Sequence, residues 1–84
     1  EIICFEAEGN FARVWSHGQS ALATITLRKL EEVLPDGAFV RLHKSYIVNV
    51  DAITEVRSGV VTLANGVDIS IGRIYRSGAS RVLE

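Results

Sequence analysis

Polar side chains with recognition chemistry gather in the middle of the chain. The run from Arg41 to Ser45 contains a guanidinium, an imidazole, an ammonium and a hydroxyl group. Such donors, placed at the ends of rigid strands, can bind phosphates and base edges. Arg and Lys donate to guanine in the major groove, and Asn can pair with adenine. The candidate donors outside this run are Asn10 and Arg13, which flank the entry to an early strand, and Arg73 and Arg76, which follow the last hairpin.

Catalytic chemistry has little support in the same residues. His43, Ser45 and Asp51 supply a base, a nucleophile and a carboxylate close together in sequence. Neither a nucleophile elbow nor a glycine-rich oxyanion loop surrounds them, so a strand-end role is favoured over a hydrolase triad. The neighbouring carboxylates are more simply solvated faces than acid–base pairs; they are Glu6 with Glu8, and Glu31 with Glu32.

A metal or cofactor site is not predicted either. Cys4, His17 and His43 share no recognised ligand spacing, and metal binding needs three or more converging ligands. The sequence contains no glycine-rich dinucleotide or phosphate-loop motif. We therefore expect a binding domain that uses no cofactor and no metal, and not an enzyme.

Length and composition limit the remaining classes. The 84 residues, 48% of them hydrophobic, suffice for one small core, and no apolar run is long enough to span a membrane. A single cysteine excludes an intrachain disulfide and fits a reducing cytoplasm. The net charge is −1, yet residues 41–84 carry six basic against four acidic side chains, which permits an anion-binding face there. The absence of methionine suggests a piece of a longer protein.

The elements that must position the polar run are mostly strands. Apolar and β-branched runs separated by turn residues every eight to twelve positions predict a mostly β, small antiparallel multi-sheet domain with one or two short helices. Thr26 is the expected N-cap of one helix, which Pro35 ends. The tail over residues 73–83 reads as either a loop or a second short helix. The expected strands cover residues 2–5, 11–16, 21–25, 39–42, 46–50, 53–57, 60–63 and 67–71.

Two local details are also predicted. Asn65-Gly66 favours a hairpin turn with positive φ at both positions. Strand 11–16 has no clear inner face, because Ala12 and Val14 share one side while Arg13 shares the other side with the aromatic residues. On these grounds alone, nucleic-acid binding and protein interaction are equally supported.

A family resemblance favours DNA. Residues 39–49, Phe-Val-Arg-Leu-His-Lys-Ser-Tyr-Ile-Val-Asn, closely resemble the signature of LytTR-type DNA-binding domains of bacterial response regulators. Residues 5–11 resemble the earlier acidic and aromatic block of the family, residues 27–35 its short helix, and residues 68–76 its late block. The four blocks occur in order and cover nearly all of residues 1–84.

The resemblance implies an elongated fold of stacked antiparallel sheets whose inter-strand loops enter successive major grooves. By position, Lys44 and Arg73 would lie at the base-contacting loops, and Asn10 would lie in the early loop. The residues implied near phosphates are Ser45, Arg13 and Arg76. His43 would either touch DNA or brace its loop.

Other residues are expected to be structural. Asn49 would satisfy turn backbone, and Tyr46 and Val48 would support the same strand. The core candidates are Phe5, Trp15, Leu27, Leu30, Leu34, Phe39, Ile47 and Leu63.

Three departures from the family pattern stand out. Gly72 replaces a serine that relatives often carry, which removes a phosphate donor. Ala12 stands where some relatives have a longer polar side chain, so weak readout by the early loop is expected. A strand that usually precedes residues 2–5 is missing, which suggests truncation and an exposed sheet edge at the N-terminus.

The resemblance also implies partners. We expect sequence-specific binding to double-stranded DNA with repeated half-sites, by two copies of the domain, because one module this small offers limited contact area. An upstream receiver or sensor domain on the same chain would control that pairing. The expected location is the cytoplasm, with no membrane contact by this domain. A protein-interaction β module that does not bind DNA is the alternative.

Overall fold

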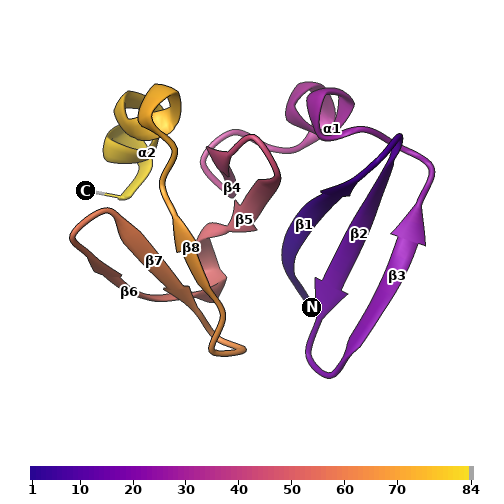
Figure 1. Cartoon of the computed structure of the whole chain (residues 1–84), viewed down its shortest axis with the longest axis horizontal. Coiled ribbons are helices and arrows are strands. Elements are labelled where there is room, and N and C mark those ends of the chain that lie inside the picture. Colours follow the sequence, from indigo (N-terminus) through magenta and orange to yellow (C-terminus); the bar gives the residue numbers. More distant parts are fainter. Residues whose placement is uncertain (84) are drawn as a thin grey trace.

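The computed structural model describes residues 1–83 as two antiparallel sheets and two short helices (Figure 1). The first sheet has the strand order β3-β2-β1-β5-β4, and the second has the order β6-β7-β8. The strands are β1 (Ile2–Glu8), β2 (Phe11–Ser16), β3 (Gln19–Ala23), β4 (Phe39–His43), β5 (Tyr46–Asn49), β6 (Ile53–Arg57), β7 (Val60–Leu63) and β8 (Asp68–Ser70). The helices are α1 (Leu27–Val33) and α2 (Arg76–Leu83), with 3-10 turns η1 (Val50–Ala52) and η2 (Arg73–Tyr75). The predicted mostly β fold is confirmed.

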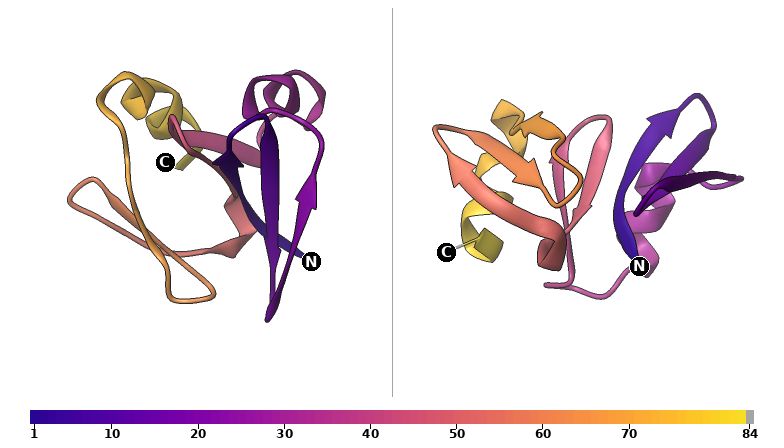
Figure 2. Two further views of the ribbon diagram at one scale, coloured as in Figure 1. Left: turned by 45° about the vertical axis from the view of Figure 1, so that its right-hand side comes forward. Right: turned by 90° about the horizontal axis from the view of Figure 1, so that it is seen from below.

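Helix α1 covers one face of the five-stranded sheet (Figure 2). Leu27 and Leu30 share one side of the helix, and they pack against Phe5 of β1, Ala12 of β2 and Ile47 of β5. The Thr26 side chain caps the helix by accepting a hydrogen bond from the Lys29 amide at 3.2 Å. The predicted cap is therefore confirmed, and the helix ends before Pro35 as expected.

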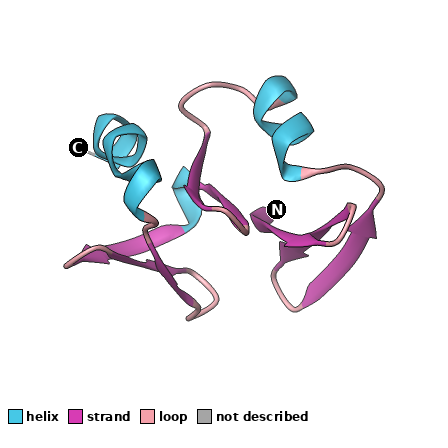
Figure 3. Cartoon of the chain, turned by 45° about the horizontal axis from the view of Figure 1, so that its top comes forward, coloured by secondary structure: helices cyan, strands magenta, loops and turns pink. Residues whose placement is uncertain are grey.

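The second core lies between the two sheets and α2, which Figure 3 shows as the helix beside the three-stranded sheet. Alternate side chains of the short strands point into it, as period-2 patterning requires. Its members include Cys4, Leu42, Val48, Val61, Leu63, Ile69 and Ala79. Of the eight predicted core residues, five are buried, whereas Trp15, Leu34 and Phe39 are only partly buried. The tail that the sequence left ambiguous is helical and closes this core through Ala79.

The prediction for the Asn65-Gly66 turn is half wrong. Gly66 has a φ of +86°, but Asn65 does not have positive φ. The Asn65 side chain instead accepts a hydrogen bond from the Val67 amide at 3.2 Å, which stabilises a wider turn. Positive φ at both turn positions occurs at Ser58 and Gly59, between β6 and β7.

The expected exposed edge at the N-terminus is also wrong. β1 lies at the centre of its sheet, hydrogen-bonded to β2 on one side and to β5 on the other. Both of its edges are paired, so they cannot accept another chain. The free edge of this sheet is β3.

The burial of individual residues shows which face of β2 points toward the core. Ala12 is fully buried beneath α1, while Arg13 lies on the opposite face of the sheet. A side chain at position 12 packs in the core, so it cannot reach DNA from this position. The expected weak readout by the early loop stays a prediction.

Asn49 has the structural role that was predicted. Its amide nitrogen donates to the Ile2 carbonyl at 2.6 Å, and its side-chain oxygen accepts from the Asp51 amide at 3.0 Å. It thus caps η1 and ties the start of β1 to the junction between the sheets.

None of the helices within residues 1–83 is long and apolar enough to cross a membrane.

Candidate nucleic-acid interface

Three polar loops lie along one edge of the molecule, toward the top of Figure 1. The Ala7 amide donates to the Ser45 carbonyl at 2.8 Å, which sets the β1–β2 turn beside the β4–β5 turn. The Gly72 amide donates to the Leu42 carbonyl at 2.7 Å, which brings the start of η2 to the same place. The loops that carry Asn10, Lys44 and Arg73 are therefore fixed relative to one another by backbone hydrogen bonds.

The β4–β5 turn is held by side chains as well. Arg41 donates from Nε to the His43 carbonyl at 2.8 Å and from its second terminal nitrogen to the Lys44 carbonyl at 2.6 Å. Its other terminal nitrogen forms an ion pair with Glu31 of α1. The Lys44 side chain is left exposed at the tip of a braced turn.

His43 braces the same turn. Its Nδ1 accepts a hydrogen bond from the Ser45 amide at 3.1 Å, and its ring lies 5.8 Å from the Tyr46 ring. Acceptance at Nδ1 requires that nitrogen to be unprotonated, so the neutral ring carries its proton on Nε2. Of the two roles expected for His43, the bracing role is therefore present in the structure.

Arg13 is engaged within its own sheet. Its Nε lies 2.9 Å from a Glu8 carboxylate oxygen, and its Nη1 donates to the Ser20 hydroxyl at 3.0 Å. A phosphate contact by Arg13 would have to compete with the Glu8 carboxylate. Its predicted place near phosphates stays a prediction.

A partly buried network supports the β4–β5 turn. The Glu6 carboxylate accepts from the Trp15 indole at 2.9 Å and from the Tyr46 hydroxyl at 3.2 Å. Burial, followed by the negative charge of Glu6, raises the pKa of Tyr46 above its ordinary value. Tyr46, the first residue after the β4–β5 turn, therefore remains a neutral hydrogen-bond donor to Glu6 at physiological pH.

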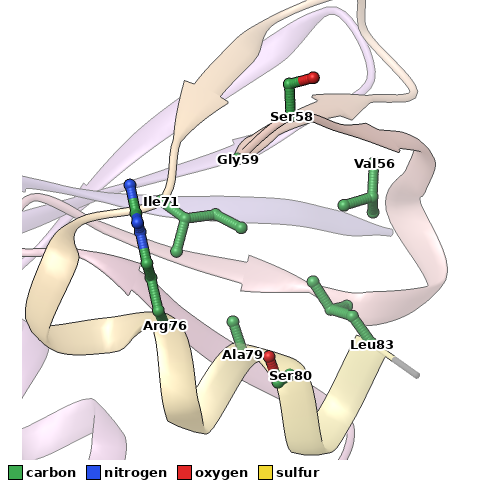
Figure 4. A pocket seen from close by; sticks show the side chains of 8 residues that line it. All are labelled: Val56, Ser58, Gly59, Ile71, Arg76, Ala79, Ser80 and Leu83. Carbon is green, nitrogen blue, oxygen red and sulfur yellow. The ribbon is translucent and has the colours of Figure 1, made fainter.

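Arg76 lies one turn beyond Arg73, and its backbone amide donates to the Arg73 carbonyl. It is the first residue of α2 and lines a cavity of about 450 Å³ between this helix and the β6–β7 turn (Figure 4). Val56, Ile71 and Leu83 form apolar walls of that cavity. Backbone hydrogen bonds thus hold the loops of Asn10, of His43 to Ser45 and of Arg73 along one edge. The Arg13 side chain is instead paired on the sheet face, and the Arg76 side chain lines this cavity.

Gly72 has a packing role at the edge. A Cβ atom at this position would lie 3.0 Å from the Tyr75 ring, a tight approach that the ring could admit only by shifting a few tenths of an ångström. The Tyr75 ring thus packs closely over the glycine. Tyr75 and Glu31 were not predicted at the site, and Arg41 was noted only as a donor. Arg41 contacts Glu31 and Tyr75, which lie 10 and 34 residues away along the chain. Local sequence spacing does not predict contacts between residues so far apart.

Comparison with known proteins identifies this arrangement. The family of LytTr DNA-binding domains matches residues 1–84. The sensory transduction protein LytT of Bacillus subtilis is 27% identical over 88 residues, which cover 99% of this chain and 36% of that protein. The solved LytTr DNA-binding domain of a putative methyl-accepting/DNA response regulator from Bacillus cereus superposes with a TM-score of 0.89 at 24% identity. The match covers 98% of this chain and 80% of that one.

The molecule is thus a small β domain of the class that presents inter-strand loops along one edge. More particularly, the chain belongs to the LytTR family of DNA-binding domains. It spans about a third of the length of the Bacillus subtilis relative, so it corresponds to one part of that protein.

Proposed function

We propose that this domain binds a specific sequence in double-stranded DNA as the output domain of a bacterial transcriptional response regulator. Lys44 and Arg73 read base edges in the major groove, and Asn10 contributes from the early loop. Ser45 supports phosphate contact beside them, as do Arg13 once released from Glu8 and Arg76 at the periphery. No catalytic step is involved.

One observation carries this proposal. Two exposed cationic side chains, Lys44 and Arg73, stand on separate loops that the Leu42–Gly72 hydrogen bond holds together. A cation on each of two fixed loops suits contacts to neighbouring base pairs, because base readout needs donors at defined positions. Membership of the LytTR family supports the same assignment.

Selection from a random duplex pool tests the proposal. We expect an enriched motif that repeats at about one helical turn, since paired modules read half-sites with that spacing. Lys44→Ala and Arg73→Ala should each lose about 1–3 kcal/mol on the selected site and little on random DNA.

Arg28→Ala is the matched control, because Arg28 is an exposed cation on α1 and belongs to none of the three loops. It should weaken binding to both DNAs by the same small factor. Equal losses on both DNAs for Lys44→Ala and Arg73→Ala would show phosphate contact only. Absence of any enriched motif at low salt, with a folded sample, would overturn sequence-specific binding.

The regulation we propose uses another part of a longer chain. A receiver or other sensory domain on the same polypeptide would raise the local pairing of two output domains and so their joint affinity. The match to about a third of a sensory transduction protein supports this arrangement. Such a regulator would act in the cytoplasm, where its DNA lies.

Protein interaction without DNA binding is the second candidate. The net charge of −1 and the exposed Phe11 and Leu22 side chains favour it. Salt separates the two functions. Affinity that falls steeply with salt indicates phosphate contacts, whereas a nearly salt-independent affinity for a protein partner would favour this alternative.

A further inference from the structure

Arg41 is the basic residue of the polar run that faces inward. Its side chain is 16% exposed, in contrast to the exposed Lys44 and Arg73. Four groups of the domain contact it. They are the His43 and Lys44 carbonyls, the Glu31 carboxylate and the ring of Tyr75, which lies 5.3 Å from the guanidinium carbon.

These contacts join three separate segments. The two carbonyls belong to the β4–β5 turn that presents Lys44, and Tyr75 belongs to η2, whose first residue is Arg73. Glu31 anchors the guanidinium to α1. One side chain therefore touches both of the loops that carry the proposed base-reading residues.

The backbone beneath Arg41 reinforces this link. The register of β4 against β5 is irregular between Arg41 and His43, at Leu42. The Leu42 carbonyl accepts the Gly72 amide at 2.7 Å, directly before Arg73. Irregular positions of this kind re-aim neighbouring groups. Here the irregular position and the Arg41 side chain act on the same two loops.

Arginine is chemically required for this set of contacts. A planar guanidinium has five N–H donors in a fixed fork, so it can bond two carbonyls and a carboxylate while its face lies on an aromatic ring. A lysine ammonium is a compact point charge and cannot make these contacts together. Replacement by lysine would keep the charge and lose the geometry.

We propose that Arg41 is a positioning residue that sets the distance and orientation of Lys44 relative to Arg73 without contacting DNA. This inference rests on the proposed function, because it assigns the spacing of the two base-reading residues to one side chain. It further makes Glu31 and Tyr75 parts of the specificity mechanism. A direct phosphate contact by Arg41 is the competing role.

The deciding variant is Arg41→Lys. If Arg41 positions the loops, this variant should bind the selected site about tenfold more weakly, with little change on random duplex DNA, because misaligned base contacts cost discrimination. If Arg41 binds a phosphate, lysine should largely preserve both affinities. Wild-type-like binding to both DNAs would overturn the positioning role.

A second measurement does not depend on DNA. In the free domain, Arg41→Lys should shift the backbone amide resonances of Lys44, Ser45 and the η2 residues together, while those of β7 stay in place. Tyr75→Leu should shift the η2 resonances and leave the Lys44 amide nearly unchanged. Shifts spread over the whole domain would indicate a general loss of folding and would overturn the specific link.

The control is Arg28→Lys, which makes the same chemical change at an exposed position of α1. It should match the wild type in both measurements. If the wild-type domain itself shows no preference for any sequence, the proposed function fails. If the wild type is specific and Arg41→Lys is equally specific, only the positioning role fails.

Discussion

The β4–β5 and β6–β7 turns both connect adjacent antiparallel strands through two residues, yet they are stabilised in different ways. Ser58 and Gly59 have φ values of +53° and +78°, the backbone form that matches the twist of a hairpin. Lys44 and Ser45 do not have positive φ, and the strand before them is irregular. That turn is held by Arg41 and His43 side chains.

This difference indicates a different role for each turn. A turn that relies on backbone preference restricts its residues to those that tolerate positive φ, but their side chains need make no contacts. A turn braced by side chains can present an L-residue such as Lys44 in a fixed orientation, because the bracing replaces the stability that a glycine would provide. The side-chain-braced turn is the one at the proposed DNA edge.

The largest expected effect is a loss of folding stability at high pH, and it arises in the sheet that carries the braced turn. Burial, and then the charge of Glu6, raises the pKa of Cys4 to about 11 from 9.0. Above pH 9 the thiol ionises in the unfolded chain but not in the folded one, so stability should fall as pH rises from 9 to 11. The slope should approach about 1.4 kcal/mol per pH unit.

Denaturant unfolding of the wild type and of Cys4→Ala between pH 8 and 11 measures this effect. Comparing the two proteins removes the contributions of other titrating groups. The difference between their unfolding free energies should shrink across that window. A difference that stays constant with pH would mean that the thiol titrates normally in the folded state.

The next effect is on the backbone-stabilised turn. Gly59→Val places a β-branched residue at a φ of +78°, which should cost about 2 kcal/mol of folding stability. Thermal unfolding measures the loss. The ratio of affinities for the selected and random DNAs should not change, and a reduced ratio would mean that this turn also positions the DNA edge.

His43→Ala should show the opposite pattern. It removes the acceptor of the Ser45 amide at an edge open to water, so the stability loss should be about 1 kcal/mol or less. The DNA affinity ratio should fall severalfold because the Lys44 turn loses a brace. Fluorescence anisotropy with the two duplexes measures the ratio, and an unchanged ratio would remove His43 from the bracing set.

The smallest effect compares two ion pairs. The Arg57–Glu55 pair beside the β6–β7 turn is highly exposed, so Glu55→Gln should change stability by less than about 0.5 kcal/mol and leave DNA binding unchanged. Glu31→Gln should likewise change stability little but lower the DNA affinity ratio, because Arg41 loses an anchor. Equal behaviour of the two variants in DNA binding would contradict the comparison.

Local patterns predicted much of the fold. Thr26, the leucines after it and Pro35 were sufficient for α1, because a cap, a helical period and a helix stop act within a few residues. Asn65-Gly66 was misjudged because the Asn side chain can bond to the backbone and so favours a wider turn. The prediction of which loops contact DNA came from the family resemblance.

The bracing of those loops could not be predicted in the same way. Arg41 interacts with Glu31 and Tyr75, whose positions depend on how α1 and η2 pack after the sheets have formed. The central place of β1 depends on its pairing with β5, which is more than 35 residues away along the chain. Such long-range contacts become visible only in three dimensions.

The close packing of Tyr75 over Gly72 has a consequence for how substitutions at the edge would combine. A Cβ atom at residue 72 would lie 3.0 Å from the Tyr75 ring, so the ring would have to shift by a few tenths of an ångström to admit it. Because the same ring lies over the Arg41 guanidinium, that shift would reach the side chain that braces the Lys44 turn. The effects of substitutions at residues 72 and 41 on DNA affinity should therefore be non-additive.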